Sequence, residues 1–251
     1  MTALDDHAVA EQLAVDAGKL LVALRTDLSL KGFDQRSIKN AGDRESHVWL
    51  MEKLAELRPE DPVLSEEGRD NSHRLSSSRA WIVDPLDGTR EYGEGREDWA
   101  VHVALAIDGE PTIGAVSLPS LDLVLSTANP PLVPERPEGQ APRLVVSRSR
   151  APFVAHAVAD ELNAEFIQLG SAGAKAMAVV LGIADIYVHA GGQYEWDNCA
   201  PAAVALAAGL HASRIDGSPM RYNNPDPYFP DLLICRKEFA DQTLEIIADL
   251  M

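Results

Sequence analysis

The spacing of hydrophobic and polar positions predicts two helices at the start of the chain. Between residues 4 and 28, apolar side chains recur every three or four positions and acidic residues come early, which is typical of a long amphipathic helix. Residues 31–40 mix charges with a glycine and predict a loop or a poor edge hairpin. Helical spacing returns over 43–57, where Asp43 stands at the N-cap position.

Strand patterns follow, from about residue 62 to residue 127. Residues 62–65 and 81–84 are short apolar runs that predict buried strands, and the second should end at or just before Pro85 because proline cannot donate to a ladder. Alternation around residues 101–106 and the turn signal Asp108-Gly109 predict an antiparallel meander. His102 lies on the alternate face of this meander and is interpreted as a structural or supporting residue.

The last part of the chain follows a third pattern, in which short strands alternate with helices. Five prolines between residues 130 and 142 separate it from the meander and predict a domain boundary. We therefore expect an N-terminal half, residues 1–135, with two helices and an antiparallel sheet, and a C-terminal α/β half, residues 143–251. The expected fold class is mixed α/β, or α+β.

Composition and charge limit the partners of this chain. Its 251 residues are 46% hydrophobic and 24% charged, and the net charge of −17 argues against a nucleic-acid polymer or an anionic membrane as a partner. An anionic substrate would need bound cations to reverse the local charge. No apolar run reaches 18 residues and the start lacks a basic segment, so the sequence predicts a cytoplasmic protein with no membrane span.

The strongest candidate chemistry is the segment Asp84-Pro85-Leu86-Asp87-Gly88-Thr89, at the end of a predicted strand. Asp84 and Asp87 would repel each other unless a cation lay between them, and hard oxygen ligands suit magnesium or manganese. Gly88 allows close approach to a ligand, and Thr89 offers a hydroxyl to a water or a phosphate oxygen. The alternative is ordinary turn chemistry.

Other polar positions also stand at the ends of predicted elements. Glu66 and Glu67 follow a strand and could simply be solvated. Asp197 suits an N-cap, but a helix N-terminus can also hold a phosphate. The segment 170–175, which includes Ser171 and Lys175, begins a helix after a strand without being a P-loop. Arg148 ends another strand, where it could form a surface ion pair or face an anionic group.

These motifs together carry a resemblance to a known family. Asp84–Thr89, with Ser65-Glu66-Glu67 before it and Glu195-Trp196-Asp197 after it, resembles the lithium-sensitive, magnesium-dependent inositol monophosphatase superfamily. Within it, residues 63–67, 170–175 and 217–223 are similar to the bacterial 3'(2'),5'-bisphosphate nucleotidase branch, particularly its actinobacterial type. The resemblance implies a layered α-β-α-β-α sandwich.

The resemblance also assigns roles to individual residues. It implies that the metal ligands are Glu66, Asp84, Asp87, Asp197 and the backbone carbonyl of Leu86. Asp43 and Thr89 would polarise the attacking water on a cation held by Glu66. Contacts to the substrate are expected from Gly88, Thr89, Arg148, Ser171 and Lys175, with Arg148 or Lys175 meeting an unreactive 5'-phosphate. Whether Glu66 or Glu67 binds the metal, and whether two or three ions take part, stays open.

The predicted function is magnesium-dependent hydrolysis of the 3'-phosphate of 3'-phosphoadenosine 5'-phosphate, giving AMP and phosphate, in sulfur assimilation. Manganese is the alternative metal. Inositol phosphates or fructose 1,6-bisphosphate are the alternative small-molecule substrates, since related members hydrolyse them. A hypothesis of another class is a non-catalytic metal or nucleotide sensor on the same scaffold. A homodimer is expected because it is common among proteins of this kind.

Overall fold

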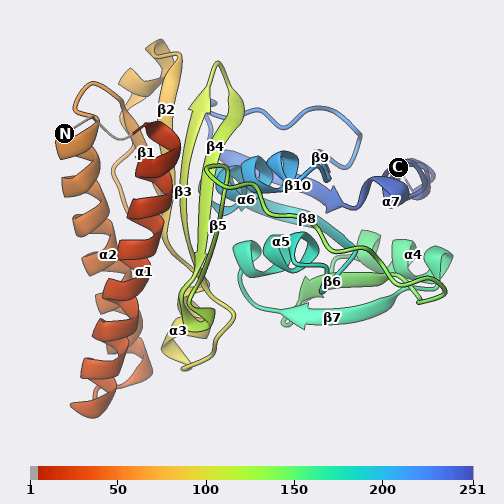
Figure 1. The fold of residues 1–251 in the computed structure, drawn as a ribbon, viewed down its shortest axis with the longest axis horizontal. Coiled ribbons are helices and arrows are strands. Elements are labelled where there is room, and N and C mark those ends of the chain that lie inside the picture. Colours follow the sequence, from red (N-terminus) through yellow and green to blue (C-terminus); the bar gives the residue numbers. More distant parts are fainter. Residues whose placement is uncertain (1–4, 251) are drawn as a thin grey trace.

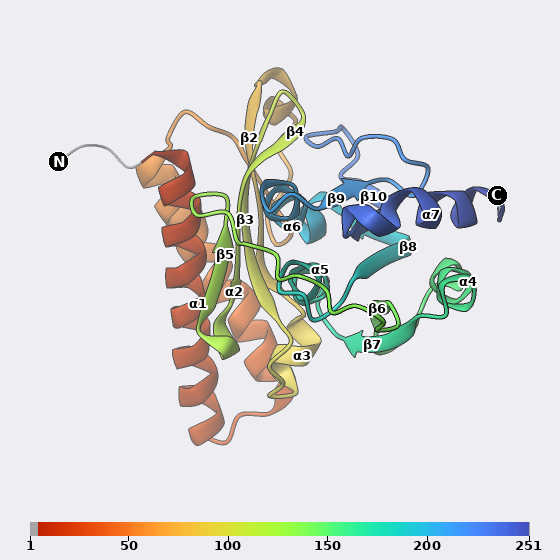
Figure 2. The same cartoon turned by 45° about the vertical axis from the view of Figure 1, so that its right-hand side comes forward.

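The computed structural model describes residues 5–250, which form five alternating layers of helices and sheets (Figures 1 and 2). Helices α1 and α2 cover the outer face of a first sheet, and α5 and α6 lie between it and a second sheet. Helices α4 and α7 cover the outer face of the second sheet. The expected α-β-α-β-α sandwich is confirmed.

The first half contains the following elements, in chain order: α1 (Asp6–Leu30), α2 (Gln35–Leu57), β1 (Val63–Ser65), the 3-10 helix η1 (Ser72–Ser76), β2 (Arg79–Asp87), α3 (Thr89–Gly93), β3 (Ala100–Ile107), β4 (Glu110–Leu118), the 3-10 helix η2 (Pro119–Leu121) and β5 (Leu123–Ser126). The second half contains these: β6 (Arg143–Ser147), α4 (Phe153–Leu162), β7 (Glu165–Leu169), α5 (Ala172–Val180), β8 (Ile186–Tyr194), α6 (Glu195–Ala207), β9 (His211–Ser213), β10 (Tyr228–Cys235) and α7 (Lys237–Ala248).

The two sheets have different topologies. The first has the order β1-β2-β3-β4-β5, with β1 parallel to β2 and the rest forming the expected antiparallel meander. The second has the order β7-β6-β8-β10-β9, with β6 parallel to both of its neighbours. Side chains alternate across each strand. On β2, Trp81 and Val83 pack toward α1 and α2, while Ile82 packs into the core between the sheets.

The structure corrects the predicted start of the second helix. α2 begins at Gln35, and its N-cap is Asp34, whose side chain accepts the N–H of Ser37 at 2.7 Å. The predicted loop at 31–40 is confirmed for residues 31–34 and wrong for residues 35–40, which belong to α2 together with Asp43. Gly42, also inside this helix, allows close packing, because a Cβ at this position would meet Leu86 at 2.8 Å. The predicted start of α1 at residue 4 lies outside the described residues.

Strand β2 also runs further than predicted. It continues through Pro85 to Asp87, across an irregular stretch where the pairing with β3 shifts between Asp84 and Asp87. Pro85 has no ladder partner in that stretch, so its missing N–H costs no sheet hydrogen bond. The irregularity turns the strand end toward the helices between the sheets.

The second half follows the predicted order of strands and helices. One core cluster combines residues of both halves, among them Ile82 and Val145, so the division at the proline-rich segment stays a prediction. Among the described residues, none of the helices is both long and apolar enough to cross a membrane.

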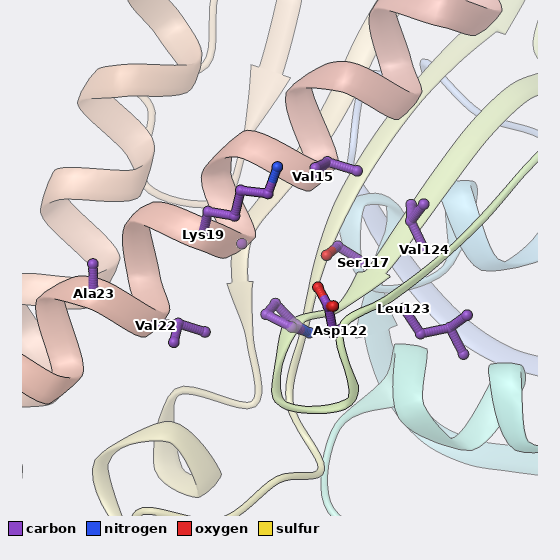
Figure 3. A pocket seen from close by; sticks show the side chains of 10 residues that line it. Val15, Lys19, Val22, Ala23, Ser117, Asp122, Leu123 and Val124 are labelled. Carbon is purple, nitrogen blue, oxygen red and sulfur yellow. The ribbon is translucent and has the colours of Figure 1, made fainter.

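A cavity of about 560 Å³ lies between α1 and the β4–β5 edge (Figure 3). It is lined by apolar side chains such as Val15 and Val124 together with Lys19 and Asp122. Gly18 of α1 faces Ser117 and leaves no room for a Cβ, so this wall of the cavity belongs to the outer face of the first sheet.

Candidate metal centre and active site

Three aspartates from the two halves of the chain meet in one acidic cluster. Asp84 and Asp87 come from the irregular end of β2, and Asp197 comes from the first turn of α6. One carboxylate oxygen from each lies within 4.8 Å of the others. Asp84 is 1% exposed and Asp87 is 5% exposed. The predicted convergence of these three residues is therefore present in the structure.

Asp87 is surrounded by groups that stabilise its negative charge. Its two carboxylate oxygens accept the backbone N–H groups of Ala172 and Gly173, at 3.1 and 2.6 Å, at the start of α5. Nε2 of the fully buried His102 lies 3.2 Å from Oδ2. Burial alone would raise the pKa of Asp87, but His102, Lys175 and the Gly173 amide together hold this pKa below its ordinary value.

His102 and Gly173 make the close contacts around Asp87 possible. His102 donates its Nδ1–H to the carbonyl oxygen of Trp196, 3.0 Å away, and its other nitrogen faces Asp87. Burial would lower the pKa of His102, but the facing carboxylate raises it. A Cβ on Gly173 would lie 2.1 Å from Nε2 of His102, so only glycine allows α5 to approach this closely. The structure places His102 beside a carboxylate of the cluster, as a supporting residue would be.

Asp84 has acidic neighbours instead. Its Oδ1 accepts the N–H of Leu86 at 3.0 Å. Burial raises the pKa of Asp84 well above its ordinary value, and the charges of Glu66, Asp87 and Asp197 raise it further. The side chain of Glu66 lies close enough to that of Asp84 for the two carboxyl groups to influence each other's pKa.

The pKa values of Glu66 and Asp197 are raised as well. Burial, followed by neighbouring acids, raises the pKa of Glu66 to about 7. Burial and the charge of Asp87 raise the pKa of Asp197 to about 7, even though its Oδ2 accepts the N–H of Tyr194 at 2.6 Å. Asp197 is the third residue of α6 and Tyr194 is the N-cap, so the N-cap alternative for Asp197 is wrong.

This donor set fits a divalent cation. The groups that converge are carboxylates, which are hard oxygen ligands of the kind that magnesium and manganese prefer. The pKa values of Glu66, Asp84 and Asp197 are raised first by burial and then by mutual repulsion, and a cation among these groups would offset both. The buried acidic cluster is therefore a candidate site for a divalent metal.

A second group of acids borders the cluster. Asp43, on α2, has its pKa raised to about 7, first by burial and then by the charge of Glu67. Glu67 also raises the pKa of Glu66. Glu67 therefore lies near both Asp43 and Glu66. Asp43 and Glu67 form the side of the site that faces α2.

The turn after Asp87 brings Gly88 and Thr89 against the second half of the chain. Gly88 adopts a left-handed conformation with φ of 83°, and a Cβ there would meet the side chain of Ser171 at 2.8 Å. Thr89 then begins the short helix α3. Ser171 caps α5, because its Oγ accepts the N–H of Ala174 at 2.9 Å. Gly88, Thr89 and Ser171 were candidate substrate contacts from the sequence.

The two candidate cations are both engaged by the protein. Lys175 is only 4% exposed, and its Nζ donates to the carbonyl oxygens of Gly170 and Ser171 at 2.6 and 2.7 Å. Arg148 forms ion pairs with Glu91 and Glu94 at 2.6 and 2.7 Å. Lys175 is thus not a solvated helix residue. A contact of either cation with substrate stays a prediction.

Sequence reasoning assigned no role to two buried acids around the site. Glu91 of α3 reaches across to Arg148, and a Cβ on Gly170 would meet its Cγ at 2.2 Å. Glu195, fully buried, accepts the backbone N–H groups of Asn223 and Asn224. Both contacts join segments that are far apart in the sequence, so the local pattern carried no signal of them.

Fold and site together define a five-layer α/β protein with a carboxylate centre of the kind that binds divalent metal. The inositol monophosphatase family matches residues 5–249, and the chain belongs to that family. It is an enzyme, a phosphatase that acts on phosphoric monoesters.

Similar proteins cover almost the whole chain. It is 51% identical over 248 residues to the 3'-phosphoadenosine 5'-phosphate phosphatase of Mycobacterium tuberculosis, covering 93% of this chain and 90% of that protein. Its identity to the protein of the same name from Mycobacterium leprae is 47% over 265 residues, covering 98% and 95%. The crystal structure of CysQ from Bacteroides thetaiotaomicron matches with a TM-score of 0.76 at 26% identity, covering 91% and 96%.

Proposed function

We propose that this phosphatase is a magnesium-dependent 3'(2'),5'-bisphosphate nucleotidase. It removes the 3'-phosphate of 3'-phosphoadenosine 5'-phosphate, gives AMP and phosphate, and serves sulfur assimilation. The observation that carries the substrate is the 51% identity, over 93% of the chain, to a mycobacterial protein that bears this activity in its name. The acidic cluster supports the reaction class.

The proposed metal ligands are the residues that meet at the end of β2. Asp84, Asp87, Asp197, Glu66 and the carbonyl of Leu86 would hold two or three magnesium ions, with manganese as the alternative. When bound, the ions supply positive charge to the phosphate oxygens, to the attacking water and to the ribose oxygen that leaves. The net charge of −17 makes this local reversal of sign necessary for an anionic substrate.

Residues on the α2 side of the site are proposed to activate the attacking water. Asp43, whose pKa of about 7 lies near neutrality, can accept a proton from the water, and the Thr89 hydroxyl orients it. Glu66 would hold the cation that binds this water, and Glu67 would support Glu66. Among the proposed catalytic residues none is a covalent nucleophile, because a positioned water suffices.

The substrate phosphates are proposed to contact Gly88, Thr89, Ser171, Arg148 and Lys175. Arg148 would have to exchange Glu91 or Glu94 for the 5'-phosphate. Such an exchange replaces one charge-assisted contact with another, so its net contribution to binding is smaller than that of a free arginine.

One assay separates the proposal from its alternatives: phosphate release from 3'-phosphoadenosine 5'-phosphate, inositol 1-phosphate and fructose 1,6-bisphosphate. We expect kcat/KM for the nucleotide to exceed the other two by at least about tenfold, a difference of about 1.4 kcal/mol. Activity should need magnesium and fall with lithium. Preference for either other substrate would assign that activity instead, and no release from any would favour the sensor.

Two further parts of the proposal are the assembly and the location. A homodimer is proposed, and sedimentation of the purified protein tests it directly. A cytoplasmic location is proposed because the substrate arises from sulfate activation, and cell fractionation tests it.

A further inference from the structure

Three aromatic side chains gather where β8 ends and α6 begins. Tyr194 and Trp196 stack with their ring centroids 4.8 Å apart and their planes 8° from parallel. Tyr228 of β10 meets Tyr194 edge-on, with centroids 6.0 Å apart. We call Tyr194, Trp196 and Tyr228 the aromatic cluster. It belongs to the second half of the chain and contains none of the proposed metal ligands.

The cluster leaves one aromatic face uncovered. Tyr194 is 46% exposed and Tyr228 is 48% exposed, whereas Trp196 is partly buried against the core between the sheets. Trp196 covers one face of the Tyr194 ring, and Tyr228 approaches its side. Neither of these two rings covers the face of Tyr194 that points away from Trp196.

This surface is held in place by the backbone. Tyr228 and Tyr194 are direct partners in the antiparallel pairing of β10 with β8. Gly192 lies under Tyr228, because a Cβ there would be 2.6 Å from its hydroxyl. The N–H of Glu195 donates to the carbonyl of Pro227 at 2.9 Å, which fixes the segment before β10 against the start of α6. The Tyr194 ring thus needs little ordering before it binds a ligand.

The cluster also adjoins the acidic cluster. The backbone N–H of Tyr194 donates to Oδ2 of Asp197 at 2.6 Å, so the aromatic surface and a proposed metal ligand share one helical turn. The carbonyl of Trp196 contacts His102, which faces Asp87. A ligand whose phosphate lies at the acidic cluster can therefore extend another part of itself toward Tyr194.

We propose that the exposed face of Tyr194, backed by Trp196, stacks on the purine base of the nucleotide substrate. This inference rests on the proposed function, because a bisphosphate nucleotide has a flat π system that inositol phosphates and fructose 1,6-bisphosphate lack. Stacking on an aromatic side chain suits any base and loses most of its strength when the ring is removed. Tyr194 is then the residue through which the site distinguishes nucleotides from sugar phosphates.

The test compares two ligands that differ only by the base. AMP and ribose 5-phosphate are titrated into the magnesium-containing protein by calorimetry. We expect AMP to bind at least about tenfold more tightly, and Tyr194→Leu to weaken AMP binding by about tenfold with little effect on ribose 5-phosphate. Tyr194→Phe keeps the ring and should bind AMP like the parent protein. Phe153→Ala removes a ring on α4 that is 76% exposed and should change neither affinity.

Leucine is the chosen replacement because it keeps apolar volume and the backbone N–H to Asp197, so the helix start should survive. An equal rise in melting temperature with magnesium in the parent and in Tyr194→Leu checks that survival. Equal weakening of both ligands would show that the ring only positions the backbone, and the stacking proposal would be overturned. Equal affinity of the parent protein for AMP and ribose 5-phosphate would overturn it as well.

Failure of this proposal is distinct from failure of the proposed function. If phosphate release favours 3'-phosphoadenosine 5'-phosphate but Tyr194→Leu binds AMP unchanged, the nucleotidase stands and the base lies elsewhere. If inositol 1-phosphate is the better substrate while AMP binding still depends on Tyr194, the stacking surface stands and the proposed substrate is wrong. Self-association of the parent protein that Tyr194→Leu abolishes, with AMP affinity unchanged, would assign the surface to a second copy of the chain.

Discussion

Asp84 and Asp87 stand three residues apart on the same strand end, yet the protein surrounds them in opposite ways. Around Asp87 lie two backbone N–H groups of α5 and the ring of His102, so the pKa of this carboxyl is held low. Around Asp84 lie further carboxyl groups, and its pKa is raised well above the ordinary range. One side of the cluster is complete in the protein alone, and the other side lacks positive charge.

The two aspartates therefore differ in what they contribute to the cluster. The side around Asp87 supplies a carboxylate that is already ionised and fixed to α5. The side around Asp84, with Glu66 and Asp197, is favourable only when protons or cations neutralise it. For the proposed metal, the free energy of binding would therefore be gained mainly on the Asp84 side, while Asp87 would set the position at which the metal is held.

The largest expected effect comes from Asp84→Asn. The amide keeps the size of the side chain and removes a charged ligand, so magnesium-dependent turnover should fall at least about a hundredfold. Without magnesium, the melting temperature should stay the same or rise, because one repelling charge is gone. Steady-state kinetics at saturating magnesium and thermal unfolding measure the two. Near-normal turnover would show that Asp84 is not a ligand.

Asp87→Asn should instead destabilise the fold. It removes the partner of the buried His102 and weakens two hydrogen bonds to α5, and breaking a buried pair on one side costs about 3 kcal/mol. In a protein of this size, that loss lowers the melting temperature by roughly 5–10 °C without metal. Thermal unfolding of the two variants side by side is the measurement. Equal stability changes in both would refute the contrast between the two sides.

The contrast itself could not be predicted from the sequence. The spacing of Asp84 and Asp87 predicted two carboxylates at a strand end, and that much is confirmed. Their different surroundings come from α5 and from His102 on β3, which the strand pattern could place on a face but not opposite a particular aspartate. Contacts between distant segments have no periodic signature along the chain.

The predicted start of α2 was wrong for a different physical reason. Gly42 lies inside α2 although glycine is unfavourable in helices, because it faces Leu86 where no Cβ fits. Tertiary packing therefore outweighed local propensity in α2, and the true cap, Asp34, went unrecognised. The layers were predictable because hydrophobic periodicity reports burial, whereas such close contacts depend on the partner surface.

A smaller effect is expected at Thr89, next to the Asp87 side. Thr89→Val is nearly isosteric and removes only the hydroxyl proposed to orient the water, so kcat should fall by about tenfold. Magnesium affinity, measured by the rise in melting temperature, should hardly change, because the carboxylates are untouched. A variant altered only in KM would show that Thr89 binds a substrate phosphate and does not act on the water.

The smallest effect, and the finest test of the comparison, is the pH dependence of magnesium binding. Glu66 and Asp197 have folded-state pKa values of about 7, above their values in an unfolded chain. The folded state therefore binds more protons between about pH 4 and 7, so metal-free stability should fall as pH rises through 7. Magnesium needs the deprotonated carboxylates, so its affinity should rise over the same range, by up to about tenfold per pH unit for each proton displaced. Melting temperatures at about pH 6 and 8, with and without magnesium, give both trends.

Glu66→Gln should flatten both pH trends, because one of the protons that magnesium displaces is no longer there. A substitution of Asp87, which is already ionised, should leave the slope in place. The same slope in Glu66→Gln as in the parent protein would mean that the protons released by magnesium come from elsewhere.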